Sequence, residues 1–253
     1  MNNVNEYVGE VKNNNFGTPM KIINARKQSD IDVQFLDKHG IIKEHTTYNN
    51  FKLGQVKNPY DRTIYGVGYL GLGMYKSKTK GGKHITSYET WRTMIMRCYD
   101  EGAEKRFPAY YGKITVCEEW HNYQSFARWY EDNFYSIGDG RMHLDKDILN
   151  QGNKIYSPEN CIFVPQRINE IFHIAARKKS DGLPVGIRIY APNGKYNASY
   201  DGKSVGIYKT VEEAIDAYLK AKKNKILRVA EEYKDVIPKK LYEALLVYKV
   251  EVE

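Results

Sequence analysis

The spacing of apolar residues changes twice along the chain, and this change limits most strongly what it can fold into. Residues 19–56 and the short runs between 185 and 208 alternate apolar with polar side chains. Residues 87–130, which lie between these segments, repeat apolar side chains three and four positions apart. Alternation is typical of half-buried strands, and the wider spacing is typical of amphipathic helices. The sequence therefore predicts a modular α+β protein.

Breaks in these patterns divide the 253 residues into modules. Residues 19–56, with a turn at Lys38-His39-Gly40, predict a small antiparallel sheet or barrel. Pro59 and the glycines of residues 66–73 end that pattern, because proline cannot donate to a strand ladder. Residues 177–182, RKKSDG, predict a polar linker. The expected modules are a β leader at 1–70, a central core with helices at 71–176 and a C-terminal module at 177–253.

The central module begins with two expected helices. Ser87 and Thr90 form a weak capping box, so the first helix is expected to start there and to end near Tyr99. The second runs from Trp120 to Tyr130, and its aromatic residues are expected in the core.

The C-terminal module is expected to be three short strands backed by a long helix. Turns at Pro192-Asn193-Gly194 and Asp201-Gly202 separate the strands. Thr210 and Glu213 form a strong capping box at the start of the helix. Pro238 separates it from a terminal helix at 239–248.

Composition narrows the class of protein. The chain is 42% hydrophobic and has no run long enough to span a membrane and no secretory signal, so we expect a soluble, cytoplasmic protein without a membrane partner. Three separated cysteines without a CxxC pair argue against a structural zinc site. The net charge of +8 and a pI of about 9.1 favour a nucleic-acid partner.

A basic run follows the glycine-rich segment and has no apolar periodicity. It is either a solvated loop or an arm that contacts phosphates. Its lysines are Lys76, Lys78, Lys80 and Lys83.

Residues 143–169 carry the most specific pattern. A short strand ending in acidic residues precedes a polar loop, a second strand at 161–164 and a helix that starts near Pro165. This order can bring Asp145 and Asn169 together, and their oxygens are ligands suited to Mg²⁺. A divalent ion there would stabilise the charge that develops on a scissile phosphate.

This segment resembles the ββα-metal core of the HNH endonucleases, most closely the phage homing-type enzymes. The resemblance covers residues 87–172, and it includes the segment before residue 143, which carries Trp and Cys residues. It implies that Asp145 is the first metal ligand, Asn160 the central asparagine and Asn169, nine positions later, the last ligand. The implied cofactor is one Mg²⁺ or Mn²⁺ ion.

The sequence departs from the family at Lys146, which stands where the family has its general-base histidine. A lysine accepts a proton at neutral pH only if burial or a neighbouring charge lowers its pKa considerably. The expected catalytic residues are therefore Asp145, Lys146 and Asn160, with Lys146 or water activated by the metal ion in the role of the base. His143 could also take this role, or the domain could bind DNA without cleaving it.

The C-terminal module resembles the AP2 domain, whose sheet enters the major groove of DNA. The resemblance implies DNA contacts from basic and polar strand residues, although alternation places them on two faces. Arg188, Lys195 and Lys203 are chemically best suited to hold phosphate or guanine. The other candidates are Tyr190, Tyr196, Ser199 and Tyr200.

Together these resemblances predict a metal-dependent endonuclease of phage or prophage origin that nicks double-stranded DNA in a bacterial cytoplasm. Two alternatives of other classes stay open. One is a non-cleaving nucleic-acid-binding regulator or counter-defence factor, with a possible host protein partner. The other is a protein-interaction module with incidental positive charge.

Overall fold

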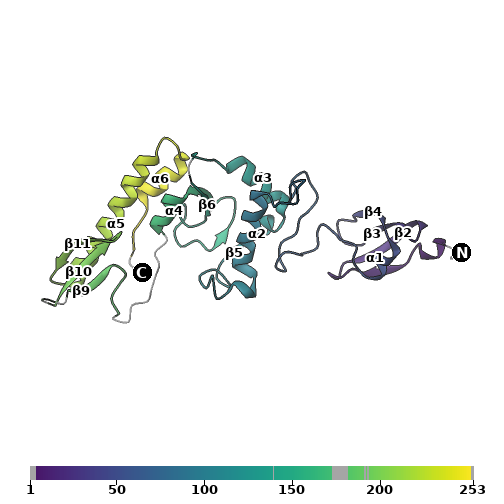
Figure 1. The fold of residues 1–253 in the computed structure, drawn as a ribbon, viewed down its shortest axis with the longest axis horizontal. Coiled ribbons are helices and arrows are strands. Elements are labelled where there is room, and N and C mark those ends of the chain that lie inside the picture. Colours follow the sequence, from purple (N-terminus) through teal and green to yellow (C-terminus); the bar gives the residue numbers. More distant parts are fainter. Residues whose placement is uncertain (1–3, 139, 173–181, 191, 193, 252–253) are drawn as a thin grey trace. The chain divides into compact units, whose positions relative to one another are not determined.

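The structure is a computed structural model that describes the chain except residues 1–3, 139, 173–181, 191, 193 and 252–253 (Figure 1). It contains helices and several small sheets, which confirms the α+β class. Contacts divide the chain into two compact units, residues 1–132 and 133–253. The division into three modules stays a prediction. Residues 177–181 of the expected linker lie outside the described residues.

The first unit opens with a four-stranded antiparallel sheet, with its strands in sequence order. One face of this sheet and α1 enclose a core that includes Met20, Val33 and Phe51. The elements are η1 (Val4–Tyr7), β1 (Val11–Asn13), β2 (Pro19–Lys27), β3 (Asp30–Phe35), β4 (Ile42–Thr46) and α1 (Tyr48–Lys52).

Helix α1 corrects the sequence interpretation, which extended the strand pattern to residue 56. Thr47 caps the helix, because its side chain accepts a hydrogen bond from the backbone of Asn50 at 3.0 Å. Phe51 then turns inward and is fully buried. A single local cap therefore overrides the alternation at the end of the sheet.

The rest of the first unit is built on two helices around buried aromatic side chains. Trp91, Trp120 and Phe126 are fully buried, whereas Tyr130 is only partly buried, so the expected core role is confirmed for part of the aromatic residues. The second helix begins at Tyr123, because Trp120 lies in a short 3-10 helix before it. The Trp91 indole donates to the backbone oxygen of Trp120 at 2.6 Å. The elements are α2 (Thr86–Tyr99), η2 (Glu101–Ala103), β5 (Thr115–Val116), η3 (Glu118–His121) and α3 (Tyr123–Asn133).

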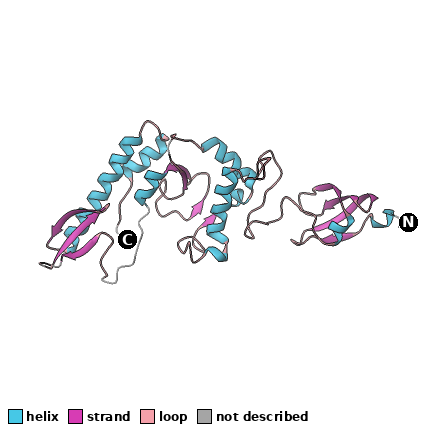
Figure 2. Cartoon of the chain, in the orientation of Figure 1, coloured by secondary structure: helices cyan, strands magenta, loops and turns pink. Residues whose placement is uncertain are grey.

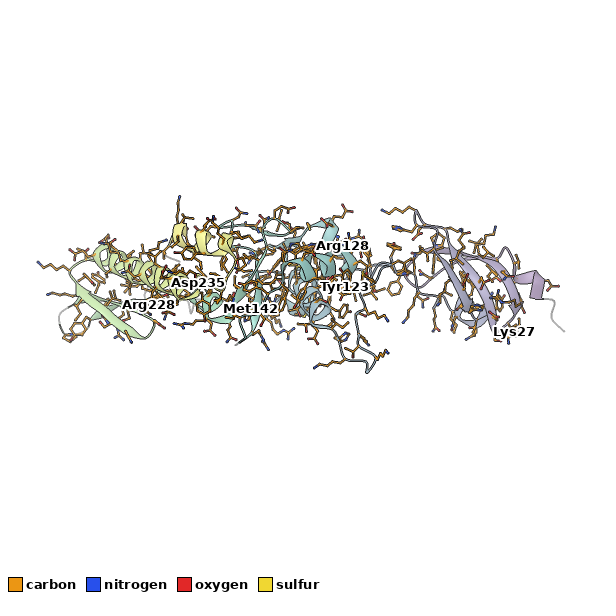
Figure 3. All side chains as sticks on the ribbon, turned by 90° about the horizontal axis from the view of Figure 1, so that it is seen from above. Lys27, Tyr123, Arg128, Met142, Arg228 and Asp235 are labelled. Carbon is orange, nitrogen blue, oxygen red and sulfur yellow. The ribbon has the colours of Figure 1, made fainter. Side chains whose placement is uncertain are left out.

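The expected cap at Ser87 is wrong. Ile85 occupies the N-cap position of α2 and makes no side-chain cap hydrogen bond. The Ser87 hydroxyl instead lies 3.0 Å from the hydroxyl of Tyr123, the buried first residue of α3. Tyr123 is labelled in Figure 3. A contact between the two helices has thus taken the side chain that local sequence assigned to the cap.

The second unit begins with an antiparallel strand pair followed by a helix. Strand β6 (Met142–Asp145) pairs with β8 (Ile162–Pro165), and α4 (Gln166–Phe172) follows directly. The loop between the two strands contains β7 (Ile155–Tyr156). This is the order of elements expected from residues 143–169.

Three further strands form an antiparallel sheet of order β11-β10-β9, backed by a long helix (Figure 2). Gly186, at the entrance to β9, has φ +84°, and a Cβ there would lie 2.3 Å from the Tyr218 ring. The elements are β9 (Ile187–Tyr190), β10 (Lys195–Tyr200), β11 (Lys203–Tyr208), α5 (Val211–Tyr233) and α6 (Lys239–Val247).

Helix α5 joins the two halves of this unit. Ala214 and Tyr218, near its start, lie in the core with the three-stranded sheet. Ile226 and Val229, two to three turns later, lie in a second core with residues of β8, α4 and α6. One uninterrupted helix of 23 residues therefore carries both cores.

The expected local signals in this unit are largely confirmed. Asp201 and Gly202 have φ of +52° and +73°, which forms the second predicted turn. Asn193, in the first predicted turn, lies outside the described residues. Pro238 is the N-cap of α6, as expected for a helix start. Among the described residues, no helix is both long and apolar enough to cross a membrane.

The capping box of α5 is present in both directions, and it predicts a measurable local stability. Thr210 Oγ1 accepts from Glu213 N at 3.2 Å, and Glu213 Oε2 accepts from Thr210 N at 3.3 Å. Thr210→Ala should cost about 1 kcal/mol. Amide hydrogens in the first turns of α5 should then exchange about fivefold faster, whereas Thr210→Ser should leave exchange nearly unchanged. Equal exchange rates in all three proteins would contradict this role.

Candidate functional site

The strand register places His143 and Asp145 on the face of β6 that lies toward the core shared with α4, α5 and α6. Asp145 lies opposite Ile162 and His143 opposite Val164, and directly opposed residues share a face. Ile162 and Val164 belong to the core shared with α4, α5 and α6. Helix α4, which carries Asn169, packs against both strands. The two expected ligands therefore come from elements in direct contact.

Asp145 is a partly buried carboxyl group, and one of its oxygens is already engaged. Its Oδ1 accepts hydrogen bonds from the backbone N–H groups of Asp147 and Ile148, both at 2.8 Å. These bonds turn the chain out of β6. Burial raises the pKa of Asp145, against the lowering effect of those two bonds. Its other oxygen, Oδ2, makes no hydrogen bond to any residue that the structure describes.

Asn169 is the polar member of the buried face of α4. It is 8% exposed and lies between the core residues Ile168 and Ile171. Within the described parts of the chain, its carboxamide has no hydrogen-bond partner.

These two side chains fit a small hard cation. Each side chain has an oxygen that accepts no hydrogen bond from a described residue. Oxygen is also the atom through which each of these side chains would bind a metal ion. Mg²⁺ is commonly held by one or two protein oxygens and keeps several waters. The donor set is therefore chemically suited to Mg²⁺ or Mn²⁺.

Lys146 is buried and holds the loop that follows β6. It is 5% exposed, and its Nζ contacts Asp147 Oδ2 at 2.6 Å and donates to the Asn153 carbonyl at 3.0 Å. Nζ also lies 6.0 Å from the centre of the Tyr156 ring. An ammonium group donates in these contacts, which favours a structural role over proton abstraction.

Asn160 connects two other asparagines of the same loop. Its Oδ1 accepts from Asn150 at 2.7 Å, and its Nδ2 donates to Asn153 Oδ1 at 3.2 Å. Asn153 in turn donates to the carbonyls of Lys146 and Ile155 at 2.9 and 2.8 Å. These are the contacts expected of a residue that fixes the geometry of the loop.

The C-terminal sheet separates the expected DNA-contacting residues onto two faces. Tyr196 and Tyr200 lie in the core with α5, and the Tyr200 ring packs edge-on against Tyr218 at 5.5 Å. Lys203 lies opposite Tyr200 and shares that face. Alternation from these residues assigns the opposite, solvent-facing side to Arg188, Tyr190, Lys195 and Ser199.

The basic run forms an ordered turn. Lys78 and His84 form an isolated antiparallel β-bridge through their backbones. Thr79 N donates to the Lys83 carbonyl at 2.8 Å, and Gly82 N donates to the Thr79 carbonyl at 3.0 Å. All four expected phosphate contacts are exposed on it, namely Lys76, Lys78, Lys80 and Lys83.

One cluster of metal-ligand type was missed by the sequence analysis. The ligand atoms of Asp30, Asp32 and His45 lie within 4.8 Å of one another. The Arg26 guanidinium already bridges the two carboxylates, with contacts of 2.8 Å to Asp30 and 2.5 Å to Asp32. These bonds hold the pKa of both carboxyl groups well below their usual range. Arginine therefore supplies the cation that a metal ion would otherwise provide.

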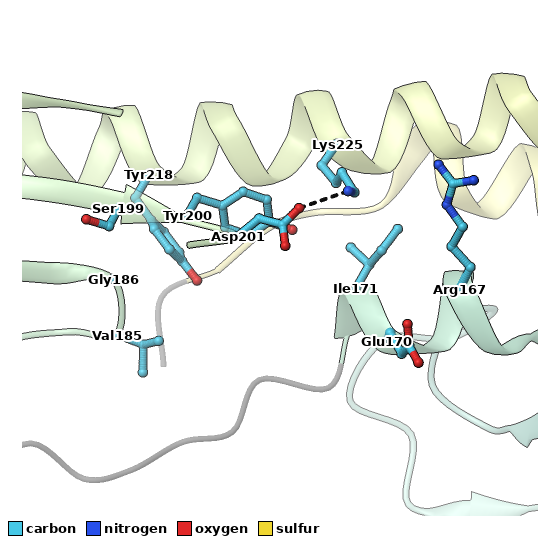
Figure 4. A pocket seen from close by; sticks show the side chains of 10 residues that line it. All are labelled: Arg167, Glu170, Ile171, Val185, Gly186, Ser199, Tyr200, Asp201, Tyr218 and Lys225. Atoms are coloured by element: carbon cyan, nitrogen blue, oxygen red, sulfur yellow. Dashed lines mark hydrogen bonds and ion pairs between the residues drawn. The ribbon is translucent and has the colours of Figure 1, made fainter. Parts of the chain in front are cut away.

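A cavity of about 320 Å³ lies between α4, α5 and the start of the C-terminal sheet (Figure 4). Its charged side chains have partners, since Lys225 contacts Asp201 at 2.9 Å and Arg167 contacts Glu232 at 2.5 Å. Asp145 and Asn169 do not line it. The candidate metal ligands thus do not belong to this cavity.

Comparison of the chain with protein-family models, with curated proteins and with solved structures gave no match. The functional argument therefore rests on the residues and their geometry.

The Arg26 cluster predicts an acid-sensitive leader sheet. The pKa of each Asp is lower in the folded chain than the ordinary value of about 3.9, so its stabilisation is present above about pH 4. It is lost as pH falls through the folded values. In Arg26→Gln, carbon NMR titration should show the Asp30 and Asp32 midpoints moving upward, whereas Lys21→Gln should leave them in place. Unchanged midpoints in Arg26→Gln would refute the assigned pairing.

Proposed function

We propose that this chain is a metal-dependent DNA endonuclease with an HNH-like ββα core, of phage or prophage origin, that nicks double-stranded DNA. The observation that carries the proposal is that β6 and α4 pack together, and that Asp145 on β6 and Asn169 on α4 each have an oxygen without a hydrogen bond to a described residue. The positions 145, 160 and 169 keep the order of the motif that the sequence resembles.

In this proposal each polar residue of the core has a distinct task. Asp145 and Asn169 hold one Mg²⁺ or Mn²⁺ ion, which supplies charge stabilisation at the scissile phosphate. Asn160 keeps the loop in shape through Asn150 and Asn153. Lys146 clamps the same loop through Asp147 and the Asn153 carbonyl, so we assign it to loop order rather than to the base.

Duplex DNA is the proposed substrate because basic side chains are exposed in both units. Arg188 and Lys195 share the solvent face of the C-terminal sheet, the AP2-like surface of the proposal. Lys76, Lys78 and Lys80 lie exposed on the basic turn of the first unit. Such groups neutralise phosphates and supply sequence-independent affinity.

A second candidate function is favoured by the contacts of Lys146. Because this residue occupies the base position and uses its protons in two contacts, the same fold would serve as a DNA-binding protein without cleavage. That protein would act as a regulator or a counter-defence factor, with a host protein as a possible partner. The assay below separates the two candidates, since this one predicts binding without strand scission under every divalent-ion condition.

Cleavage should depend on Asp145 and on a divalent ion. With supercoiled plasmid and Mg²⁺ or Mn²⁺, the wild-type chain should produce nicked circles, and EDTA should stop the reaction. Asp145→Ala should be inactive. Asp145→Asn should also be inactive although it keeps an oxygen that can accept the two turn hydrogen bonds. Asp235→Ala, which removes an exposed carboxylate from the same unit, should cleave normally.

Two results would refute the metal site. One is nicking by the Asp145 variants at the wild-type rate, with folding verified by circular dichroism. The other is nicking that persists in EDTA.

DNA affinity should distinguish the two faces of the C-terminal sheet. Each phosphate contact contributes about 0.9 to the slope of log affinity against log salt. Arg188→Ala and Lys195→Ala together should reduce the slope by about 1.8 in an anisotropy titration. Lys203→Ala, on the helix side, should change it little. A larger effect of Lys203→Ala would show that the face is assigned incorrectly.

A further inference from the structure

The loop from Leu70 to Met74 is held in place by one side chain of α3. Gln124 Nε2 donates to the carbonyls of Leu70 at 3.1 Å and Tyr75 at 2.9 Å, and its Oε1 accepts from Tyr75 N at 3.0 Å. A single glutamine thus ties both ends of the loop. The loop is therefore preorganised and loses little freedom when it binds a partner.

The two glycines of this loop are pressed against the start of α3. A Cβ on Gly71 would lie 2.3 Å from Asn122 Oδ1, and one on Gly73 would lie 2.3 Å from Gln124 Oε1. Gly71 N also donates to the Pro59 carbonyl at 2.9 Å. The backbone therefore packs closely against other residues at both glycines. The larger side chains of the loop are those of Leu72, between the glycines, and of Leu70 and Met74 on either side.

Those larger residues are apolar and exposed. Leu70 is 36%, Leu72 55% and Met74 80% exposed. Isolated exposed apolar residues are common on protein surfaces, but three within five residues of a fixed loop are not scattered. The loop is held in a conformation that leaves its apolar side chains exposed to solvent.

The surroundings of the loop are strongly basic in sequence. Residues 62–88 contain five Lys or Arg and no Asp or Glu. Four of these, all exposed, are the lysines of the basic turn that directly follows Met74. Acidic groups also lie near: Glu131 accepts a hydrogen bond from the Tyr75 hydroxyl at 2.6 Å, and the charges of Asp132 and Glu118 act on Tyr75 and Tyr69. The apolar residues Leu70, Leu72 and Met74, followed by the lysines of the basic turn, would complement a polyanion whose interior is apolar.

Duplex DNA has both properties. Leu and Met side chains are used as wedges that insert between base pairs from the minor groove and kink the duplex. Lysines beside a wedge neutralise the adjacent phosphates. An apolar protein surface would match the tip but would not explain the cationic flank.

We propose that Leu70, Leu72 and Met74 form an apolar wedge that inserts between base pairs of duplex DNA and bends it, with the basic turn on the neighbouring phosphates. This inference rests on the proposed function for the choice of duplex DNA as partner. It adds a DNA-deforming element in the first unit, separate from the metal ligands and from the C-terminal sheet.

The test is DNA bending by the full-length chain. A mixed-sequence duplex, labelled at its two ends for energy transfer, is titrated in Ca²⁺ so that bending is read without cleavage. The wild-type chain should raise the transfer efficiency. Leu72→Ser with Met74→Ser should return it to the value of free DNA. Leu246→Ser with Val247→Ser removes an exposed apolar pair of α6 as a matched control and should bend DNA as the wild type does.

The outcomes separate this inference from the proposed function. Bending without nicking in Mg²⁺ leaves the wedge in place and removes the endonuclease. Nicking with no bending, or equal bending by the Leu72/Met74 variant, overturns the wedge alone. A third outcome is that the wild type self-associates in sedimentation, the Leu72/Met74 variant does not, and neither bends DNA. This result would assign the loop to contact with a second copy of the chain and would overturn the wedge. Absence of DNA binding would overturn both.

Discussion

The burial of the β6–β8 pair, whose strand β8 is buried on both faces, sets the surroundings of the candidate site. Ile162 and Val164 on β8 lie in a core with α4, α5 and α6, and the register sets Asp145 and His143 on the same face. Burial there raises the pKa of Asp145, while its two backbone hydrogen bonds and the charge of Lys146 lower it. Asn169, from the helix that covers the strands, adds an amide to the same interface. In the proposed function, a metal ion takes an oxygen from each of these two side chains.

The loop between the two strands shows why these residues keep their positions without regular structure around them. Lys146, Asn153 and Asn160 are connected by hydrogen bonds across the loop. Lys146 donates to the Asn153 carbonyl, Asn153 donates to the Lys146 carbonyl, and Asn160 donates to the Asn153 side chain. Such networks give a loop a single shape when all members have partners. The first turn of the loop is fixed by Asp145 itself. The candidate ligand is therefore also part of the scaffold that presents it.

Sequence patterns predicted the elements whose signals are local. The alternation of β9 to β11, the capping box of Thr210 and Glu213, and the order of strand, loop, strand and helix after residue 142 were all legible. The errors arose where distant contacts compete with local ones. Ser87 bonds to Tyr123 and does not cap α2, and Arg26 fills an acidic cluster that no spacing rule identifies. Residue order suggested the pairing of Asp145 with Asn169, but their spare oxygens became visible only with the packing of α4 on β6.

The most direct test is a crystal structure of the full-length chain grown with Mn²⁺, with the ion located by its anomalous scattering. The account predicts one peak at about 2.1 Å from an Asp145 oxygen and from the Asn169 carboxamide oxygen. It would be contradicted by Asp145 and Asn169 side chains that point apart, or by a peak at Asp30, Asp32 and His45 with none beside Asp145.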